Sequence, residues 1–294
     1  MLLAVEIGNT NIKFGIFETS GAAAGTLVHT WRSVTDRLVT GDDLAAQVDA
    51  MLRLNGVKRS AVKRVAVASV VPPLYRAVSG MAQQYFNCRP EFLSAARQTI
   101  VPVKTRHPAE LGADLIGGAI GAVSKYGPPL IVVQFGTATT FAAISDLGEY
   151  LGTAIAPGIE VSVDALIGRA AKLMDVPLIK PPAAIGTDTA TALQSGIILG
   201  VIGQVEYLVS LFAKEMKTKP KVIATGGLVE LIAPHIGIFD VTDERLVLDG
   251  LYVWAAKSAR RARAPETPER LESTQRSTRA QFESTQRSTR AKLE

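Results

Sequence analysis

The sequence predicts an α/β protein made of two duplicated lobes with a cleft between them. Two similar stretches carry this prediction, because each is an apolar strand that enters a glycine turn and continues as a second strand. The turns are 8–10 (Gly-Asn-Thr) and 136–138 (Gly-Thr-Ala). Strands also alternate with amphipathic helices, as in α/β folds. A duplicated hairpin would place two similar loops on opposite walls of one cleft.

The first half of the chain follows the order strand, strand, strand, helix, strand, helix. Leu44, Val48, Met51 and Leu52 have helical spacing, and a Thr-Gly-Asp-Asp start precedes them. The predicted strands are 2–7, 12–17, 26–32 and 62–70, and the predicted helices are 40–56 and 74–85. A further helix is predicted from Pro108 to Tyr126.

The second half repeats the pattern. Strands are predicted at 130–135, 139–145, 149–155 and 221–224, and helices at 160–172, from 189 to about 214, and from 246. Glycines at 196, 200 and 203 predict that another backbone packs closely against the long helix. The same spacing occurs in lipid-embedded helices, but we expect this helix to be too polar for that environment.

The two turns suit a triphosphate and its metal. Glycine lets backbone N–H groups approach phosphate oxygens, and the neighbouring Asn and Thr side chains add donors. Two alternatives stay open. An ordinary hairpin with an Asn/Gly turn would explain the first stretch, and chance similarity would explain the likeness of the two stretches. The candidate nucleotide-binding residues are Glu6, Gly8, Asn9, Thr10, Lys13, Gly136 and Thr137.

Two further motifs complete a resemblance. Together with the loops, the stretches 110–114 (Glu-Leu-Gly-Ala-Asp) and 155–159 (Ile-Ala-Pro-Gly-Ile) resemble the type III pantothenate kinases, from Met1 to about Ala256. That family belongs to the actin-like and sugar-kinase ATPase superfamily. The resemblance implies two actin-like (ribonuclease-H-like) lobes, a homodimer that forms through the second lobe, and ATP-dependent phosphorylation of pantothenate, the first step of coenzyme A biosynthesis.

The resemblance also implies roles for single residues. Asp114 matches the general base, although without the family an Asp early in a helix simply favours the helix dipole. Gly112, Ala113 and Thr189 match positions that contact pantothenate. ATP and Mg²⁺ are the implied cofactors, and the metal positions are Glu6 and, weakly, Gln134.

Four positions depart from the family pattern. The family has aspartate where this chain has Glu6, Gln134 and Ala142, and arginine where it has Leu115. Glu6 moves its carboxylate outward by one methylene, and Gln134 offers only a neutral amide to a monovalent cation, so use of K⁺ or NH₄⁺ is left open. Leu115 removes a cation that would orient an anionic group.

Two functional hypotheses from different classes therefore stand. One is a working pantothenate kinase whose geometry has adjusted around Glu6. The other is a catalytically impaired relative that binds a nucleotide or metabolite and acts as a regulator or partner subunit. A kinase for another hydroxylated acid is a third hypothesis. Asp164 and Asp188 are the acids that could compensate for the lost charges.

Composition describes an ordinary globular protein. Hydrophobic residues make up 47% and charged residues 20% of the chain, which suits a substantial core. No apolar stretch long enough to span a bilayer is evident, and a single cysteine, Cys88, excludes an intrachain disulfide framework and suits a reducing cytoplasm. Three histidines without ligand spacing argue against a zinc site.

We predict lobes at 1–115 and 116–257 and a basic tail at 258–294. Nine Lys/Arg and five Glu from Ala259 onward account for most of the net charge of +5, so the body is nearly neutral and nucleic-acid binding is not expected. The tail contains a nine-residue repeat at 272–280 and 283–291 and few apolar residues. It is interpreted as a disordered or loosely helical appendage or an artificial addition, with a phosphate-binding arm as the alternative.

Overall fold

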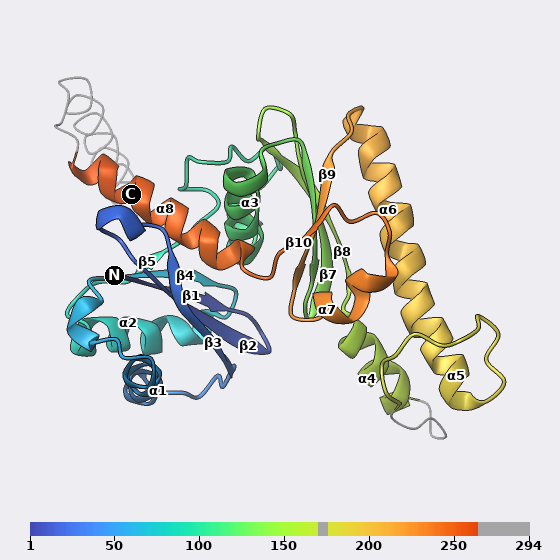
Figure 1. The fold of residues 1–294 in the computed structure, drawn as a ribbon, viewed down its shortest axis with the longest axis horizontal. Helices are drawn as coiled ribbons and strands as arrows, with labels where there is room; N and C mark the ends of the chain where they lie inside the picture. The colour runs from blue at the N-terminus through green and yellow to red at the C-terminus, as the bar shows by residue number, and fades with distance from the viewer. Residues whose placement is uncertain (170–175, 264–294) are drawn as a thin grey trace, which may run out of the picture. The chain divides into compact units, whose positions relative to one another are not determined.

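A computed structural model describes residues 1–169 and 176–263, and residues 1–255 form one compact unit. Its first sheet has the order β3-β2-β1-β4-β5 (Figure 1). β1, β2 and β3 are antiparallel, and β4 and β5 run parallel to β1. The strands are β1 (Leu2–Ile7), β2 (Asn11–Phe17), β3 (Leu27–Val34), β4 (Arg64–Ser69) and β5 (Glu91–Phe92).

The second sheet repeats the first. Its order is β8-β7-β6-β9-β10, with β6, β7 and β8 antiparallel and β9 and β10 parallel to β6. The strands are β6 (Leu130–Phe135), β7 (Ala138–Ile144), β8 (Tyr150–Pro157), β9 (Lys221–Gly226) and β10 (Val241–Thr242). Because each strand has a counterpart in the same place, the predicted α/β fold with two actin-like lobes is confirmed.

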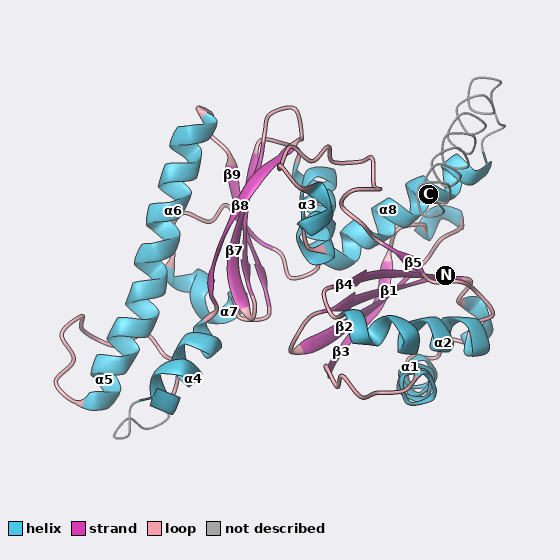
Figure 2. Ribbon diagram, turned by 180° about the vertical axis from the view of Figure 1, so that it is seen from behind, coloured by secondary structure: helices cyan, strands magenta, loops and turns pink. Residues whose placement is uncertain are grey.

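The outer face of the first sheet is covered by α1 (Gly41–Leu54) and α2 (Tyr75–Tyr85), as Figure 2 shows. A capping box starts α1, since the Thr40 side chain accepts from the Asp43 backbone and the Asp43 carboxylate accepts from the Thr40 backbone. Leu44, Val48 and Leu52 of α1 are buried in one core with alternate side chains of the sheet. Their helical spacing produced this packing, as predicted.

Two helices lie between the sheets, α3 (Ala113–Tyr126) and α8 (Leu246–Arg263). A single core joins apolar side chains of both sheets to Ile116 and Ile120 of α3 and to the first turns of α8. The helices approach to backbone contact, because a Cβ at Gly250 would lie 2.9 Å from Gly121 N and a Cβ at Gly121 would lie 2.9 Å from the Leu246 carbonyl carbon. Only glycine fits at this contact.

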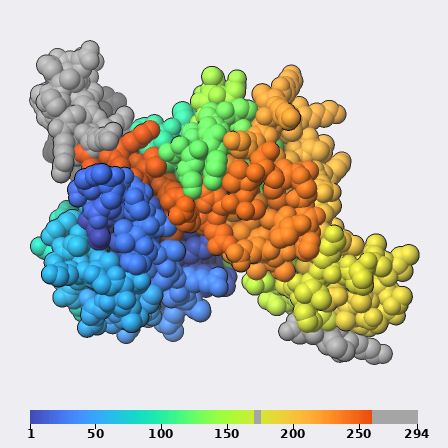
Figure 3. Space-filling model, in the orientation of Figure 1, coloured from blue at the N-terminus to red at the C-terminus, as the bar shows by residue number. Residues whose placement is uncertain are grey.

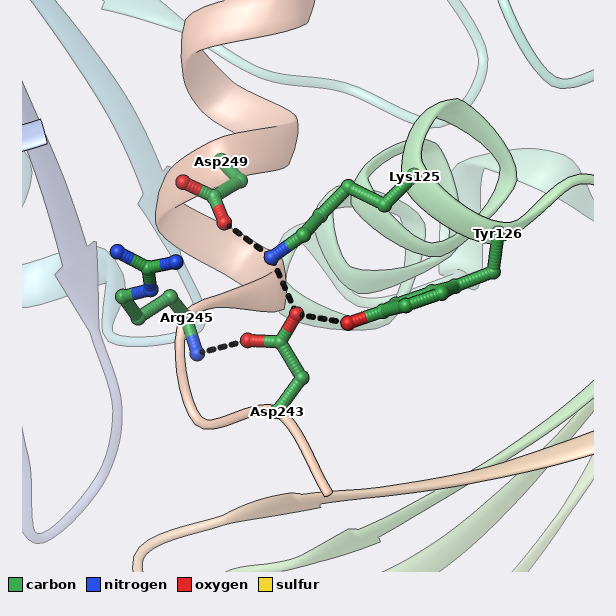
Figure 4. Close-up of polar contacts among 5 residues, drawn as sticks. All are labelled: Lys125, Tyr126, Asp243, Arg245 and Asp249. Carbon is green, nitrogen blue, oxygen red and sulfur yellow. Dashed lines mark hydrogen bonds and ion pairs between the residues drawn. The ribbon is translucent and has the colours of Figure 1, made fainter. Parts of the chain in front are cut away.

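A polar cluster fixes the end of α3 to the start of α8 (Figure 4). Lys125 donates to Asp243 and, at 2.9 Å, to Asp249; Tyr126 donates its hydroxyl proton to Asp243 at 2.7 Å; and the Arg245 backbone N–H donates to Asp243 at 3.0 Å. Burial alone would raise the pKa of Asp243, but the bonds from Lys125 and Tyr126 outweigh it and hold that pKa below its ordinary value.

The outer face of the second sheet packs against α4, η5, α6 and α7, and α5 continues the long helix beyond this core. Their bounds are α4 (Ile159–Arg169), α5 (Thr189–Gln194), the π-helical segment η5 (Ser195–Leu199), α6 (Gly200–Met216) and α7 (Val229–Ile232). The short 3₁₀ turns are η1 (Gly21–Ala23), η2 (Arg59–Ala61), η3 (Pro72–Leu74), η4 (Pro108–Glu110) and η6 (Ala233–His235).

The long helix differs from its prediction in two ways. A Cβ at Gly196, Gly200 or Gly203 would have no described atom within 4 Å, so no backbone in the described part of the chain packs there. The most apolar 18-residue stretch of the helix Thr189–Met216 has a mean hydropathy of 1.8, so by length and composition this helix could cross a membrane, whereas the sequence analysis judged it too polar. Length and hydropathy alone are weak evidence, because helices of soluble proteins pass the same test.

One predicted helix starts later than expected. The stretch from Pro108 is the separate turn η4, and α3 begins only at Ala113, because Gly112 is extended with φ −54° and ψ 141°. The lobe boundary at 115 stays a prediction. Of the predicted tail, 264–294 lies outside the described residues.

Candidate functional site

The two glycine loops meet across a cleft. Thr10 Oγ1 of the first loop and Thr137 Oγ1 of the second lie 3.0 Å apart, although 127 residues separate them in the chain. The cleft has a volume of about 580 Å³, which is in the range of small-ligand sites. It is lined by both loops, the start of α3, and the turn after β9.

The first loop is held by its own hairpin and by the end of β3. The Gly8 N–H donates to Asn11 O at 3.0 Å, and the Thr35 hydroxyl donates to Gly8 O at 2.7 Å. The Arg37 guanidinium reaches Asn9 Oδ1 at 3.4 Å. With these groups paired, the loop has a defined shape before any ligand binds.

The second loop is held by the 155–159 motif and by the turn after β9. The Gly158 N–H donates to Thr137 O at 3.0 Å, and a Cβ at Gly158 would lie 2.5 Å from the same oxygen. Gly226 has a φ of +106°, and a Cβ there would lie 2.6 Å from Phe135 N. Both glycines are therefore required by close backbone contacts with the loop, which explains why the motif accompanies it.

A row of side chains crosses the cleft-facing side of each sheet. In the first sheet Glu6, Lys13 and Arg32 are neighbours on β1, β2 and β3. In the second sheet Gln134, Thr140 and Ile155 are neighbours on β6, β7 and β8. All six side chains line the cleft. The rows occupy equivalent places, but the first is charged and the second is neutral.

Glu6 is a partly buried acid at the base of the first loop. Burial raises the pKa of Glu6, the positive charge of Lys13 lowers it, and the negative charge of Asp114 raises it further. The net direction is upward from 4.5. A carboxylate in this position repels a polyphosphate unless a cation accompanies the ligand.

Asp114 stands in the first turn of α3, facing the cleft. Its Oδ1 accepts the Leu115 N–H at 2.9 Å, and a Cβ at Gly112 would lie 2.5 Å from that oxygen, so glycine at 112 makes room for the carboxylate. Burial raises the pKa of Asp114, while the Leu115 N–H and the Gln134 side chain, which hydrogen-bonds the carboxylate, oppose the rise. Because a carboxylate only accepts, the Gln134 amide is the donor.

Most of the predicted site residues come together here. The predicted residues that line the cleft are Glu6, Gly8, Asn9, Thr10, Lys13, Gly112, Asp114, Leu115, Gln134, Gly136 and Thr137. Ala113 and Thr189 are not in this lining. Thr189 begins α5, and Figures 1 and 2 show α5 on the side of the second sheet that faces away from β1 and β2.

The compensating acids suggested by the sequence do not line the cleft. Asp188 caps α5, where its carboxylate accepts the Thr191 N–H at 2.9 Å, and Asp164 lies on α4 outside the lining. Ala142 is buried in the core between the sheets, so no charge replaces the family's aspartate there. The acid that the sequence analysis missed is Glu160, in the first turn of α4 directly after the 155–159 motif.

Arg32 was also missed. The signal that could have found it is the period of two along neighbouring strands, which puts Arg32 beside Lys13 once the hairpin is extended to β3. Leu115 and Val70 both line the cleft, and Leu115 contributes an apolar surface where the resemblance implies a cation.

A second concavity, of about 680 Å³, lies in the second lobe away from both loops. It is lined by Val229, Glu230, Ala233, Pro234, Thr242 and Glu244. Its two charged residues are both acids, which disfavours an anionic ligand. The orange surface in Figure 3 belongs to this C-terminal part of the chain, which includes α7 and β10. The cleft with the loops is therefore the candidate site.

The cleft offers one carboxylate and one neutral amide, Glu6 and Gln134, at the two positions considered for metal ions. The Glu6 carboxylate, beside a phosphate loop, is an oxygen ligand of the kind that Mg²⁺ shares with bound phosphates. The described residues contain no group of three or more His, Cys, Asp or Glu side chains that could hold a metal by themselves. Gln134 carries no charge and its amide N–H donates to Asp114, so it offers a monovalent cation only a neutral amide oxygen.

Comparisons with known proteins agree with this geometry. A family model of type III pantothenate kinases matches residues 2–211. Among solved structures, the chain is similar to a protein from Campylobacter jejuni named as a Baf family transcriptional activator, with 18% identity, a TM-score of 0.53, and coverage of 88% of this chain and 99% of that one.

Two other solved structures share the fold. A protein from Sinorhizobium meliloti named as a 2-dehydro-3-deoxygalactonokinase has 15% identity and a TM-score of 0.51, with coverage of 91% of this chain and 98% of that one. Ethanolamine utilization protein EutJ from Carboxydothermus hydrogenoformans has 14% identity and a TM-score of 0.51, with coverage of 86% and 89%. At these identities the likeness concerns the fold alone.

Proposed function

The chain belongs to the type III pantothenate kinase family, and from this premise we propose that it transfers the γ-phosphoryl group of ATP to the primary hydroxyl of pantothenate. The product would be 4′-phosphopantothenate, the first intermediate toward coenzyme A. The observation that carries the proposal is the 3.0 Å contact between Thr10 and Thr137, which joins two phosphate loops beside Asp114.

The loops would bind and orient the phosphate chain. The loops offer hydrogen-bond donors of the kind that surround a phosphoryl group during its transfer. These donors are the backbone N–H groups around Gly8 and Gly136 and the hydroxyls of Thr10 and Thr137. Mg²⁺, held by Glu6 and the phosphates, would neutralise charge on the leaving phosphate. Phosphoryl transfer depends mostly on position and charge, so a preformed loop pair contributes directly to the rate.

Asp114 would accept the proton. The pantothenate oxygen forms a bond to the γ-phosphorus, the bond from that phosphorus to the β–γ bridging oxygen breaks, and the hydroxyl proton passes to the Asp114 carboxylate as ADP leaves. The amide of Gln134 and the N–H of Leu115 hold this carboxylate in place and favour its charged form.

A second candidate function is favoured by the neutral row in the second sheet. A relative that lost the charges at Gln134 and Leu115 could retain nucleotide binding without turnover and act as a regulator or partner subunit. Both candidates predict ATP binding, so binding alone does not distinguish them.

We also propose a homodimer in the cytoplasm. Its support is the apolar helix Thr189–Met216, of whose most apolar stretch only 17% is buried, and Tyr207 on it is 66% exposed. Burial of such a surface against a second copy would remove it from water. Light scattering of the purified chain and of Tyr207→Glu tests this, and a wild type of monomer mass contradicts it.

The kinase proposal is tested by measuring 4′-phosphopantothenate from ATP and pantothenate with Mg²⁺, with and without K⁺. The wild type is compared with the double variant Glu6→Asp, Gln134→Asp and with Asp114→Asn. We expect product from the wild type, without a need for K⁺, and far slower product formation from Asp114→Asn.

Two other outcomes of this assay would contradict the kinase proposal. Product from the double variant alone would support the non-catalytic binder and locate the loss in the two exchanged residues. If none of the chains that still bind ATP forms product, pantothenate is not the substrate. Other hydroxylated acids would then be assayed as substrates.

A further inference from the structure

Arg32 is a cation of the cleft that has no hydrogen-bond or ion-pair partner among the described residues. It lies on β3, its guanidinium is exposed, and it lines the cleft. Among the side chains described, those of 1–169 and 176–259, none forms a hydrogen bond or ion pair with that guanidinium. By contrast Arg64, on the same sheet, is paired with Glu91 at 2.7 Å and also donates to Ala255 O.

The strand on either side of Arg32 is firmly placed. Trp31 stacks on Phe14 with ring centroids 5.1 Å apart and an interplanar angle of 9°. The Thr30 hydroxyl donates to Phe14 O at 2.8 Å, and Thr35 bonds the first phosphate loop. The backbone of Arg32 is thus fixed relative to that loop, and its side chain points to the same face as Lys13.

The charge of the cleft needs this residue. Its charged lining residues are three acids, Glu6, Asp114 and Glu160, against two cations, Lys13 and Arg32. Without Arg32 a polyphosphate would meet three carboxylates and one ammonium. A guanidinium suits phosphate oxygens better than an ammonium, because its planar fork donates two parallel hydrogen bonds.

We propose that Arg32 binds the phosphate chain of the nucleotide beside Lys13 and supplies the cationic contact that the cleft lacks at Leu115. The ligand class is a nucleoside polyphosphate, so the inference rests on the proposed function for the identity of the ligand. It does not require turnover, because binding alone would show it.

The test measures affinity for ATP and for adenosine by competition with a fluorescent ATP analogue, with Mg²⁺ at fixed ionic strength. The variants are Arg32→Met and Arg32→Lys, with Arg76→Met as a control, since Arg76 is an exposed arginine on α2 outside the cleft. We expect Arg32→Met to weaken ATP binding about 10- to 100-fold and adenosine binding less than about twofold. Arg32→Lys should recover part of the loss, and Arg76→Met should behave as wild type.

A merely structural role would lower both affinities equally, and an unchanged affinity for ATP would also overturn the inference. Thermal unfolding of each variant shows whether it is folded. A wild type that does not bind ATP would overturn it too. Phosphopantothenate formation in the same samples keeps the two proposals apart: binding that depends on Arg32 without product would retain the inference and contradict the kinase.

Discussion

The two sheets present equivalent rows to the cleft, yet the rows differ in charge. Glu6, Lys13 and Arg32 cross the first sheet, whereas Gln134, Thr140 and Ile155 cross the second. The backbone was duplicated with its register, but the side chains were not. A shared fold therefore sets where a side chain stands, and only its own chemistry decides what it does there.

Substitution of Asp114, the proposed general base between the two rows, should have the largest effect. Asp114→Asn should lower turnover by about 10²- to 10⁴-fold, because an amide cannot accept the hydroxyl proton, while ATP affinity changes little. Steady-state kinetics and ATP binding measure both. Glu160→Gln is the control, since Glu160 also lines the cleft. An equal loss in the control would assign the effect to cleft charge instead of the base.

Exchanging charge between the rows should matter next. Glu6→Gln should lower turnover about 100-fold, since it removes the carboxylate proposed to hold Mg²⁺. Gln134→Glu should lower it about 10-fold, because a third acid joins Glu6 and Asp114 and the amide bond to Asp114 is lost. We expect K⁺ to restore part of the activity of Gln134→Glu alone. Equal K⁺ responses in wild type and variant would show that a carboxylate at position 134 does not bind K⁺.

The polar cluster that joins the end of α3 to the start of α8 tests whether the two rows depend on this contact for their relative position. Asp243→Asn should lower the free energy of unfolding by about 2 kcal/mol at pH 7, because it weakens charged hydrogen bonds from Lys125 and Tyr126. Urea denaturation measures it, and Asp146→Asn, in an exposed turn, is the control.

The same polar cluster predicts that the free energy of unfolding depends on pH. The folded state lowers the pKa of Asp243 from 3.8, so its contribution to stability is present above that value and is lost as pH falls through the lower pKa of the folded state. The difference between wild type and Asp243→Asn should therefore shrink only below 3.8. A difference that disappears near neutral pH would contradict the assignment.

The neutral row should give the smallest effect. Thr140 Oγ1 is buried and, among the described residues, has no hydrogen-bond partner. Thr140→Val should change the free energy of unfolding by less than about 0.5 kcal/mol, since no internal bond is lost, while ATP affinity falls several-fold if the ligand uses this hydroxyl. A large loss of stability would show that the hydroxyl has a structural partner.

The sequence predicted the parts that follow from local periodicity. Aligning Gly8 with Gly136 placed Glu6 opposite Gln134, and the strand register shows them at equivalent positions. Asp114 was expected on a helix facing the cleft, and it lies on α3 in the lining of the cleft. These predictions succeeded because glycine turns and strand alternation are encoded over a few residues.

The rest depended on contacts between distant segments. Arg32 lines the cleft only because β3 pairs with β2 in a register that puts it beside Lys13, and Glu160 does so through the placement of α4. Asp188 has acid chemistry, but its carboxylate is used as a helix cap. The later start of α3 depends on an extended Gly112, whose missing Cβ serves the carboxylate two residues on.

The glycine contact between α3 and α8 separates two kinds of evolutionary loss. A Cβ at Gly121 or Gly250 would overlap the facing backbone whatever the protein does in the cleft. A descendant that abandoned catalysis could exchange Asp114 freely, but it could not exchange these two glycines and remain folded. Relatives that keep both glycines but lack the acid would have lost catalysis and retained the fold. Relatives that lack the glycines would have lost the constraint on the fold as well.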